Sequence, residues 1–422
     1  MALTNFSSAL EKYAELIVKV GLNLRPGQRL LISNPSTLGV QLHVAPLVRQ
    51  ITLSAYQAGA RFVDVIWGDD QMRRMRYEHA PHDSFTEFPT WQVNGIMDIL
   101  NHGDAYLSLR SNNPDLLKDQ DPKLVGITAD TLWKQMEPVG DAITRNATNW
   151  CVIAAPRPDW AVKVFPDLSD EAAEEKLWQA ILEITRVDQP DPLAAWQDHI
   201  RDLLARSRYL NAKQYATLKY KAPGTDLTIG LPKGHLWISA RMTAKNGIDF
   251  TANLPTEEVF TLPHKDRIDG VVTASMPLSY SGVLIEDIQL TFENGRVVKA
   301  SATKSEAVLQ KLIATDAGAA GLGEVALVPH SSPVARRGHL FFDALIDENA
   351  ASHLALGDAY RFTLKDGDSL SEEQFAACGG NKSLVHVDFM VGSKQMDIDG
   401  VKEDGTCEPV MRGGEWAFDS TN

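Results

Sequence analysis

Four short segments in the second half of the chain carry the side chains that could do chemistry. They are Asn253–Pro263, which contains Glu257 and Glu258, the pair Gly323-Glu324, the stretch from Glu348 to His353, and His386-Val-Asp388. Imidazole nitrogens together with carboxylate oxygens are the ligands that Zn, Co and Mn use in proteins. The four segments therefore predict a metal site in this half of the chain.

Each segment also has an ordinary explanation when it is taken alone. The pair Glu257-Glu258 lies at a predicted turn-to-strand junction between two prolines, where acidic residues are usually solvated. His386 and Asp388 point to the same face of a predicted strand, which also suits a hydrogen-bonded pair in a core. Glu324 could be a surface residue and His353 a capping or core histidine. Four unrelated carboxylates in one such domain are harder to explain, so the metal hypothesis depends on the segments jointly.

The first half of the chain alternates predicted strands with predicted helices. This rhythm indicates right-handed βαβ units, an α/β domain with a mostly parallel sheet, and helices on both of its faces. The predicted strands are 29–35, 62–67, 105–110 and 150–155, and the predicted helices are 4–21, 41–58, 86–101 and 129–145.

Two further helices, 169–186 and 192–207, precede a change of pattern. From Tyr215 onward, short apolar runs are separated by turn signals such as Asn294-Gly295, which is typical of β-hairpins. We expect strands at 216–220, 226–230, 270–274 and 288–292, with one helix at 303–316. The predicted domains are an α/β domain over 1–208 and an α+β, largely antiparallel, metal-binding domain over 209–422.

Composition excludes several classes of protein. The chain has 422 residues, a net charge of −14 and no block rich in Lys or Arg, which argues against nucleic acid or an anionic membrane as a partner. It contains three scattered cysteines, a number that suits free thiols in a reducing compartment. The first residues lack the basic and apolar regions of a signal peptide, so we expect a cytoplasmic protein. The glycines of 318–323 have the wrong spacing for a nucleotide-binding loop.

The four segments, in their order along the chain, resemble the thermophilic-type metallo-aminopeptidases, the family of aminopeptidase T, aminopeptidase S and PepS. The resemblance is carried by Asn-Leu-Pro-Thr-Glu-Glu-Val-Phe-Thr (253–261), Gly-Leu-Gly-Glu (321–324), Asp-Glu-Asn-x-x-x-His-x-Ala-Leu-Gly-x-Ala-Tyr (347–360) and His-x-Asp-Phe-Met (386–390). It extends over nearly the whole chain. One departure is Ser352, where the family often has Cys, but this neighbour of His353 is not a ligand.

The resemblance implies a homodimer with a two-metal centre in the C-terminal domain of each subunit. The implied metal ligands are Glu258, Glu324, Glu348, His353, His386 and Asp388. Position within the motif favours Glu258 over Glu257 as the ligand. Tyr360 matches the family's tyrosine near the metals, where it would donate to the oxyanion of the transition state. Glu257 is then a candidate proton shuttle.

Charge supports this assignment, because four carboxylates would balance two divalent cations. Such a pair of ions would polarise a peptide carbonyl and hold a bridging water that ionises near neutral pH. The sequence thus predicts an aminopeptidase that uses two ions of Zn, Co or Mn and a metal-bridging hydroxide to remove the N-terminal residue from short peptides. Two alternatives remain open. One is a metallohydrolase of another amide, and the other is a small-molecule binding protein with a structural metal site.

Overall fold

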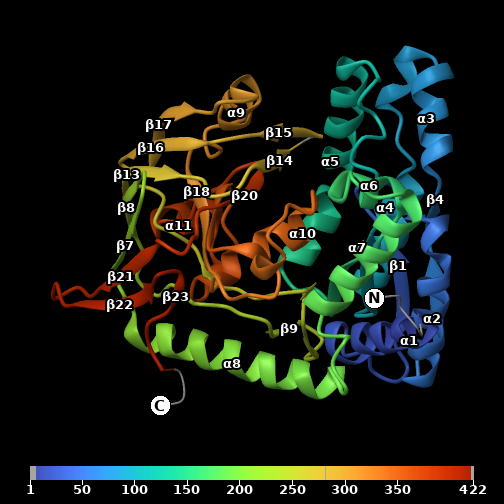
Figure 1. Cartoon of the computed structure of the whole chain (residues 1–422), viewed down its shortest axis with the longest axis horizontal. Coiled ribbons are helices and arrows are strands. Elements are labelled where there is room, and N and C mark those ends of the chain that lie inside the picture. Colours follow the sequence, from blue (N-terminus) through green and yellow to red (C-terminus); the bar gives the residue numbers. More distant parts are fainter. Residues whose placement is uncertain (1–5, 281, 420–422) are drawn as a thin grey trace. The chain divides into compact units, whose positions relative to one another are not determined.

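The computed structural model describes residues 6–280 and 282–419 (Figure 1). The chain divides into two compact units. The first extends to Gln197 and includes a later segment, Arg241–Pro255, whereas the second comprises Asp198–Ala240 and the chain from Thr256 onward. The predicted domain boundary after residue 208 stays a prediction.

The first unit is built on a parallel sheet of five strands, in the order β11-β6-β5-β1-β3. Its strands are β1 (Arg29–Ser33), β3 (Phe62–Val65), β5 (Ala105–Arg110), β6 (Trp150–Ala154) and β11 (Asn253–Leu254). The four strands predicted for this half all form, and the α/β class is confirmed. Strands β2 (Val40–Gln41) and β4 (Trp67–Gly68) form a separate, short parallel pair.

Helices pack on the two faces of this sheet. Leu31 and Tyr106 point to one face, where they join a buried cluster with residues of α4 and α5. Cys151 points to the other face, and Gly21 lies so close that a Cβ there would come within 2.8 Å of its Sγ. The helices of this unit are α1 (Phe6–Leu16) with a π-helical turn (Ile17–Gly21), α2 (Ala45–Gln57), α3 (Asp70–His79), α4 (Thr90–Asn101), α5 (Pro122–Thr144), α6 (Pro158–Val164) and α7 (Asp170–Ile184), and α8 (Pro192–Lys213) continues into the second unit.

Several elements of the first unit differ from the sequence prediction, and for three of them the physical reason is clear. Helix α5 begins at Pro122 and not near 129, because Asp121 caps its first turn by accepting a hydrogen bond from Lys123 N at 2.8 Å. Helix α3 was not predicted, since it is largely polar and has no apolar stripe. Strand β11 was not predicted either, because Asn253 and Leu254 gain their strand conformation only by pairing with Val152 and Ile153, far away in sequence.

The second unit contains two antiparallel sheets, which confirms the predicted α+β class. The larger sheet has eight strands in the order β17-β16-β13-β8-β7-β21-β22-β23. The turn between β16 and β17 has positive φ at both Asn294 (50°) and Gly295 (82°), as the predicted hairpin requires. In chain order the strands of this sheet are β7 (Thr217–Ala222), β8 (Thr225–Gly230), β13 (Ile268–Thr273), β16 (Gln289–Glu293), β17 (Arg296–Ser301), β21 (Asp397–Val401), β22 (Cys407–Arg412) and β23 (Glu415–Trp416).

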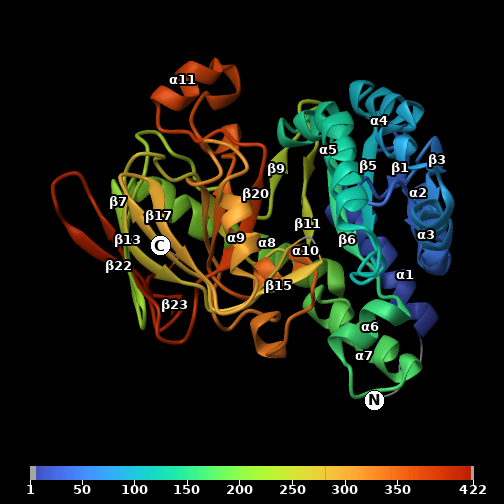
Figure 2. The same cartoon turned by 90° about the horizontal axis from the view of Figure 1, so that it is seen from above.

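The smaller sheet of the second unit has the order β12-β18-β19-β20. Its last strand, β20, is labelled in Figure 2. Its strands are β12 (Val259–Thr261), β18 (Leu322–Leu327), β19 (His353–Gly357) and β20 (His386–Met390). The helices of this unit besides α8 are short: α9 (Glu306–Ile313), α10 (Ala344–Asp347) and α11 (Glu372–Ala377). Each unit also contains one small antiparallel pair of strands. In the first unit β9 (Met242–Thr243) pairs with β10 (Asp249–Phe250), and in the second β14 (Leu278–Tyr280) pairs with β15 (Val283–Ile285). Within the described residues, every helix is too short or too polar to cross a membrane.

Candidate metal centre

The smaller sheet of the second unit holds most of the predicted ligands. Glu324 lies in β18, His353 begins β19, and His386 and Asp388 lie in β20. Glu258 is the residue before β12, at the turn-to-strand junction that the sequence predicted. Adjacent strands of an antiparallel sheet therefore bring together residues that are far apart in the sequence.

The register of the sheet places these side chains on one face. Glu324 is opposite Ala355, and Ala355 is in turn opposite Asp388, so the three residues form one row across β18, β19 and β20. His353 is opposite Ala326 and lies two residues from Ala355, on the same face. Alanines at the intervening positions leave space above the sheet, and larger side chains there would fill the volume between the polar groups.

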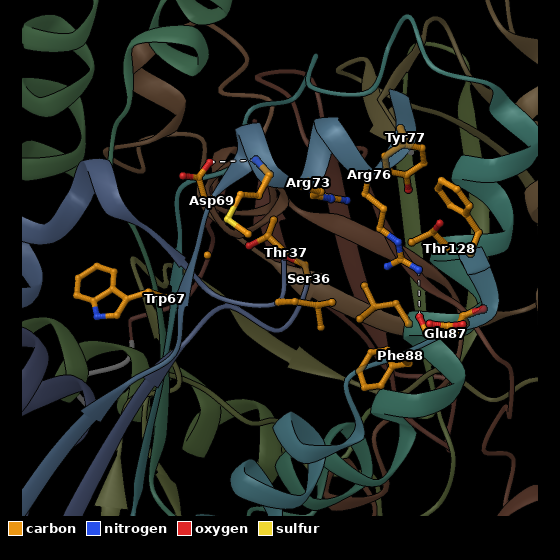
Figure 3. Close-up of a pocket in the computed structure, with 16 residues that line it drawn as sticks. Ser36, Thr37, Trp67, Asp69, Arg73, Arg76, Tyr77, Glu87, Phe88 and Thr128 are labelled. Carbon is orange, nitrogen blue, oxygen red and sulfur yellow. Dashed lines mark hydrogen bonds between the residues drawn. The ribbon is translucent and has the colours of Figure 1, made fainter. Parts of the chain in front are cut away.

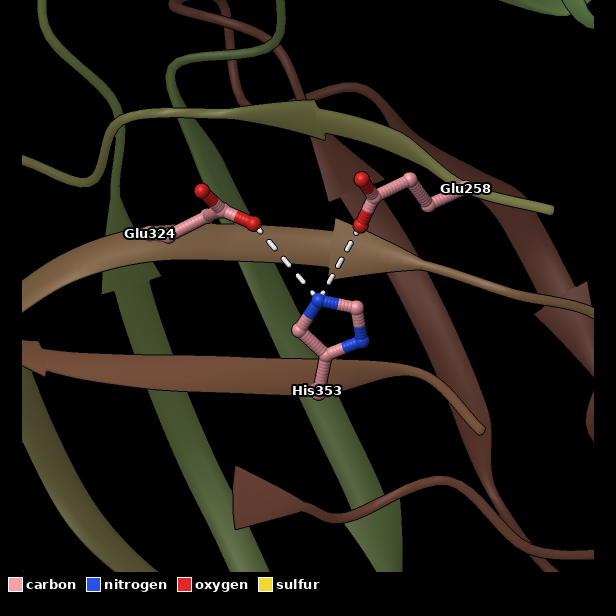
Figure 4. A group of neighbouring side chains, drawn as sticks. All are labelled: Glu258, Glu324 and His353. Carbon is pink, nitrogen blue, oxygen red and sulfur yellow. Dashed lines mark ion pairs between the residues drawn. The ribbon is translucent and has the colours of Figure 1, made fainter. Parts of the chain in front are cut away.

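One group of possible ligands centres on His353 (Figure 4). Its Nε2 lies 3.1 Å from Oε2 of Glu258 and 3.5 Å from Oε1 of Glu324. All three side chains are buried. One ligand atom from each lies within 4.8 Å of the others, so the three could hold one metal ion together.

A second group centres on His386. Its Nε2 lies 3.7 Å from Oε2 of Glu324 and 3.5 Å from Oδ1 of Asp388. The three ligand atoms again lie within 4.8 Å of one another. Glu324 thus faces one histidine with each of its two oxygens and belongs to both groups of possible ligands.

Backbone carbonyls orient both imidazoles. Nδ1 of His353 lies 3.1 Å from the carbonyl oxygen of Ala351, and Nδ1 of His386 lies 2.8 Å from that of Asp358. When each Nδ1 donates its proton to the carbonyl, Nε2 is left to the carboxylate cluster, as in histidines that ligate metals. Gly323 makes one of these contacts possible, because a Cβ at residue 323 would lie only 2.0 Å from the Asp358 carbonyl oxygen.

The electrostatics of the cluster indicate a shortage of positive charge. Burial, together with the charge of Glu258, raises the pKa of Glu324 to about 7. Burial opposes protonation of His353, yet its hydrogen bonds to Glu258 and Glu324 raise the pKa of this imidazole well above its usual value. The carboxylate of Asp388 likewise raises the pKa of His386 to about 10 against the effect of burial.

Asp388 provides a further test of whether the residues suit a metal ion. Its Oδ1 atom is buried and has no hydrogen-bond partner among the described residues. Its nearest charged neighbour is Nε2 of His386 at 3.5 Å, and coordination of a cation would satisfy this oxygen, which is costly to bury without a hydrogen bond. The donor set of carboxylate oxygens and imidazole nitrogens fits a divalent transition-metal ion.

The remaining predicted ligand, Glu348, begins a short 3-10 helix, Glu348–Ala350, and is half-buried. Its carboxylate lies within electrostatic reach of Tyr360. Burial raises the pKa of the Tyr360 hydroxyl well above its usual value, and the charges of Glu324, Asp388, Glu348 and Glu258 raise it further. The tyrosine ring lies 4.7 Å from the His386 ring, measured between centroids. Tyr360 is therefore a protonated hydroxyl that lies beside the cluster.

Glu257, the predicted proton shuttle, is also buried. Its Oε2 lies 3.6 Å from Nε2 of His199, which comes from α8. Its backbone N donates to Oδ1 of Asn349 at 2.6 Å, and this amide is fully buried. Asn349 thereby ties the turn that carries Glu257 and Glu258 to the short helix that carries Glu348. Sequence reasoning missed both His199 and Asn349, although Asn349 lies inside one of the motifs.

The chain resembles known proteins over nearly its whole length. The family model of the thermophilic metalloproteases (M29) matches residues 6–416. The chain belongs to this family. The predicted family is confirmed, and with it the prediction that the chain is a metallo-exopeptidase.

Members of the M29 family match this chain over its full length. Aminopeptidase 2 of Geobacillus stearothermophilus is 47% identical, over 99% of this chain and 100% of the relative. Aminopeptidase AmpS of Bacillus subtilis is 44% identical, with the same two coverages. The solved structure of wild-type AmpT from Thermus thermophilus superposes with a TM-score of 0.91 at 43% identity, over 98% of this chain and 100% of that one. This M29 structure confirms the predicted fold class of both parts of the chain.

Proposed function

We propose that the protein is a two-metal aminopeptidase that removes the N-terminal residue from short peptides. The observation that carries the proposal is the position of Glu324 between two groups of ligands, one with Glu258 and His353 and the other with His386 and Asp388. A carboxylate shared in this way supports two adjacent ions better than one. The aminopeptidase names of the full-length relatives support the same reaction.

The proposed ligands are the six residues Glu258, Glu324, Glu348, His353, His386 and Asp388. Their four carboxylates balance the charge of two divalent ions, of which Zn, Co and Mn suit this donor set. When bound, the ions would supply Lewis acidity and an activated water for attack on the peptide carbonyl. The ions would also neutralise a carboxylate cluster that otherwise relies on protonated histidines.

Two residues of the chain have proposed roles in proton handling. Tyr360 keeps its proton, because its pKa is raised, and it can therefore donate a hydrogen bond to the oxyanion that develops on the substrate carbonyl. We propose Glu257 as the proton shuttle, with Nε2 of His199 beside its carboxylate, 3.6 Å from Oε2. We further propose a cytoplasmic homodimer whose substrates are short peptides with a free N-terminus.

The experiment compares hydrolysis of free-amine and N-acetylated di- and tripeptides by EDTA-treated protein, before and after addition of Zn, Co or Mn. We expect the ion to restore cleavage of the free-amine peptides alone. Cleavage of both classes would show a broader amidohydrolase. Tight metal binding that stabilises the fold without any cleavage would overturn the catalytic proposal and leave a structural site.

A further inference from the structure

A cavity of about 340 Å³ lies in the first unit, and none of the residues that line it is a proposed metal ligand (Figure 3). It is bordered by the loop after β1, which contains Ser36 and Thr37, by the start of α3, and by the middle of α5. In α/β domains, ligands bind beyond the carboxyl ends of the parallel strands, where such loops lie. The volume is at the small end of the range for ligand pockets, so the cavity suits a small molecule.

Arg73 supplies a positive charge to this cavity. Arg73 is half-buried, and its guanidinium makes no hydrogen bond or ion pair with any described residue. Arg76, one turn further along α3, is already hydrogen-bonded. The Nη2 of Arg76 donates to the carbonyl oxygens of Ser84 (2.9 Å) and Glu87 (3.2 Å). A guanidinium without a partner that borders a cavity is suited to binding an anionic oxygen pair such as a carboxylate.

The helix that carries Arg73 is held firmly in place. Asp69 caps its first turn by accepting hydrogen bonds from Gln71 N at 2.7 Å and Met72 N at 3.2 Å. Asp70 forms a buried ion pair with Arg157, which follows β6. These contacts fix the direction of α3, so Arg73 is presented to the cavity before any ligand arrives. A preorganised charge of this kind lowers the cost of binding.

Five hydroxyl groups border the cavity, those of Ser36, Thr37, Tyr77, Thr128 and Thr131, and all except that of Tyr77 donate their protons to other parts of the chain. Ser36 donates to Oδ1 of Asn34 (2.7 Å) and Thr37 to the carbonyl oxygen of Gly39 (2.9 Å). Thr128 and Thr131 donate to the carbonyl oxygens four residues earlier in α5, at 2.9 and 2.8 Å. A hydroxyl that has donated its proton can only accept a further bond. These four Ser and Thr hydroxyls therefore offer only acceptors, which suit a ligand that has N–H donors as well as an anion.

The remaining lining restricts the ligand further. Met72, Phe88 and Leu132 provide apolar surface. The charged lining residues are two arginines and two acids, the latter being Asp69 and Glu87, so the net charge is zero. Asp69 and Glu87 would repel a dianion such as phosphate, whereas a zwitterion offers one charge to the arginines and the opposite charge to the acids.

We propose that this cavity binds a free α-amino acid with an apolar side chain. Arg73 takes the carboxylate, the hydroxyl oxygens around Thr128 accept from the ammonium group, and the side chain lies against Phe88 and Leu132. The proposed metal centre would release such amino acids as products. A regulatory use of the cavity therefore rests on the proposed function, whereas binding of the amino acid to the cavity does not.

The test is calorimetric titration of EDTA-treated, full-length protein with L-leucine, leucinamide, N-acetyl-L-leucine and inorganic phosphate. We expect L-leucine to bind, leucinamide and N-acetyl-L-leucine each to bind at least about tenfold more weakly, and phosphate not to compete. Arg73→Ala should reduce leucine affinity at least about tenfold. The control is Arg74→Ala, because Arg74 does not line the cavity and pairs with Glu78 (2.7 Å) on the exposed side of α3. It should leave leucine affinity unchanged.

Thr128→Val sharpens the test because it removes an acceptor without changing the size of the side chain. It should weaken binding of L-leucine but not the residual binding of N-acetyl-L-leucine, which has no ammonium group. Thermal unfolding of each variant shows that it is folded. No leucine binding by the wild type, or equal binding by the wild type and Arg73→Ala, would overturn the inference while leaving metal-restored hydrolysis intact. Arg73-dependent binding without hydrolysis would overturn the proposed function alone.

Discussion

Two clusters of charged side chains in the second unit, one around Glu408 and one around Glu324, surround a glutamate with opposite kinds of neighbour. Around Glu408, one carboxylate is surrounded by donors: Lys213 Nζ at 2.7 Å, Lys402 Nζ at 2.6 Å and the Tyr215 hydroxyl at 2.8 Å. The cluster around Glu324 instead gathers several carboxylates around two imidazoles and leaves Oδ1 of Asp388 without a hydrogen bond among the described residues.

The two clusters also shift the pKa of their central glutamate in opposite directions. The two lysines and Tyr215 lower the pKa of Glu408 to about 2, whereas burial and neighbouring acids raise the pKa of Glu324 to about 7. A cluster whose charges are balanced by its own side chains stabilises the fold and needs nothing further. An excess of buried carboxylate points to a cation from outside the chain.

The largest expected effect comes from replacing Glu324, the carboxylate that both proposed ion positions share. Glu324→Gln keeps the shape of the side chain and removes its charge, so both proposed ion positions lose a ligand. We expect kcat/KM for a free-amine dipeptide to fall about a thousandfold or more, together with loss of bound metal measured by elemental analysis. Glu403→Gln, on an exposed turn of the same unit, is the control and should change neither quantity.

A smaller effect is expected at the hydroxyl beside the cluster. Tyr360→Phe removes only the proposed donor to the oxyanion, so kcat should fall by about a hundredfold to a thousandfold while metal content stays at the wild-type level. Tyr56→Phe, on the exposed side of α2, serves as the control for loss of a phenolic hydroxyl. A variant at Tyr360 that lost its metal instead would show that this residue organises the cluster and does not act on the substrate.

Metal removal distinguishes the two clusters by their effect on stability. An ion at a hundred times its dissociation constant stabilises a folded protein by about 2.7 kcal/mol, so adding it back to EDTA-treated protein should raise the thermal midpoint. Glu324→Gln should abolish most of this rise, but Glu408→Gln should not. An equal rise in the wild type and Glu324→Gln would place the stabilising ion elsewhere.

The contrast between the clusters also explains what could be predicted from the sequence. Glu324, His386 and Asp388 lie in β18 and β20, where a carboxylate or an imidazole stands out among apolar neighbours. Glu258, Glu348 and His353 lie in the other short motifs quoted from the sequence. Lys213, Lys402 and Glu408 resemble ordinary surface residues, and only the pairing of β7 with β21 and of β21 with β22 brings them together. Strand β11 escaped prediction for the same reason. The carbonyls that orient His353 and His386 could not be predicted either, because every residue has one.

The smallest expected effect is at Glu408 itself. Glu408→Gln removes a carboxylate with two lysines and a buried tyrosine as donors, but these lysine and glutamate side chains are 25–32% exposed and partly screened by solvent. We expect a loss of about 1–2 kcal/mol in the free energy of unfolding at pH 7, against about 0.5 kcal/mol or less for Asp226→Asn, whose pair with Lys221 is far more exposed. Because the folded-state pKa of Glu408 is lowered from 4.5 to about 2, its stabilisation is fully present above pH 4.5 and is lost as the pH falls towards 2. Urea unfolding at pH 7, 5 and 3 should therefore show the gap between wild type and Glu408→Gln narrowing only at the lowest pH. A gap that did not change with pH would mean that Glu408 stabilises the second unit through packing and not through charge.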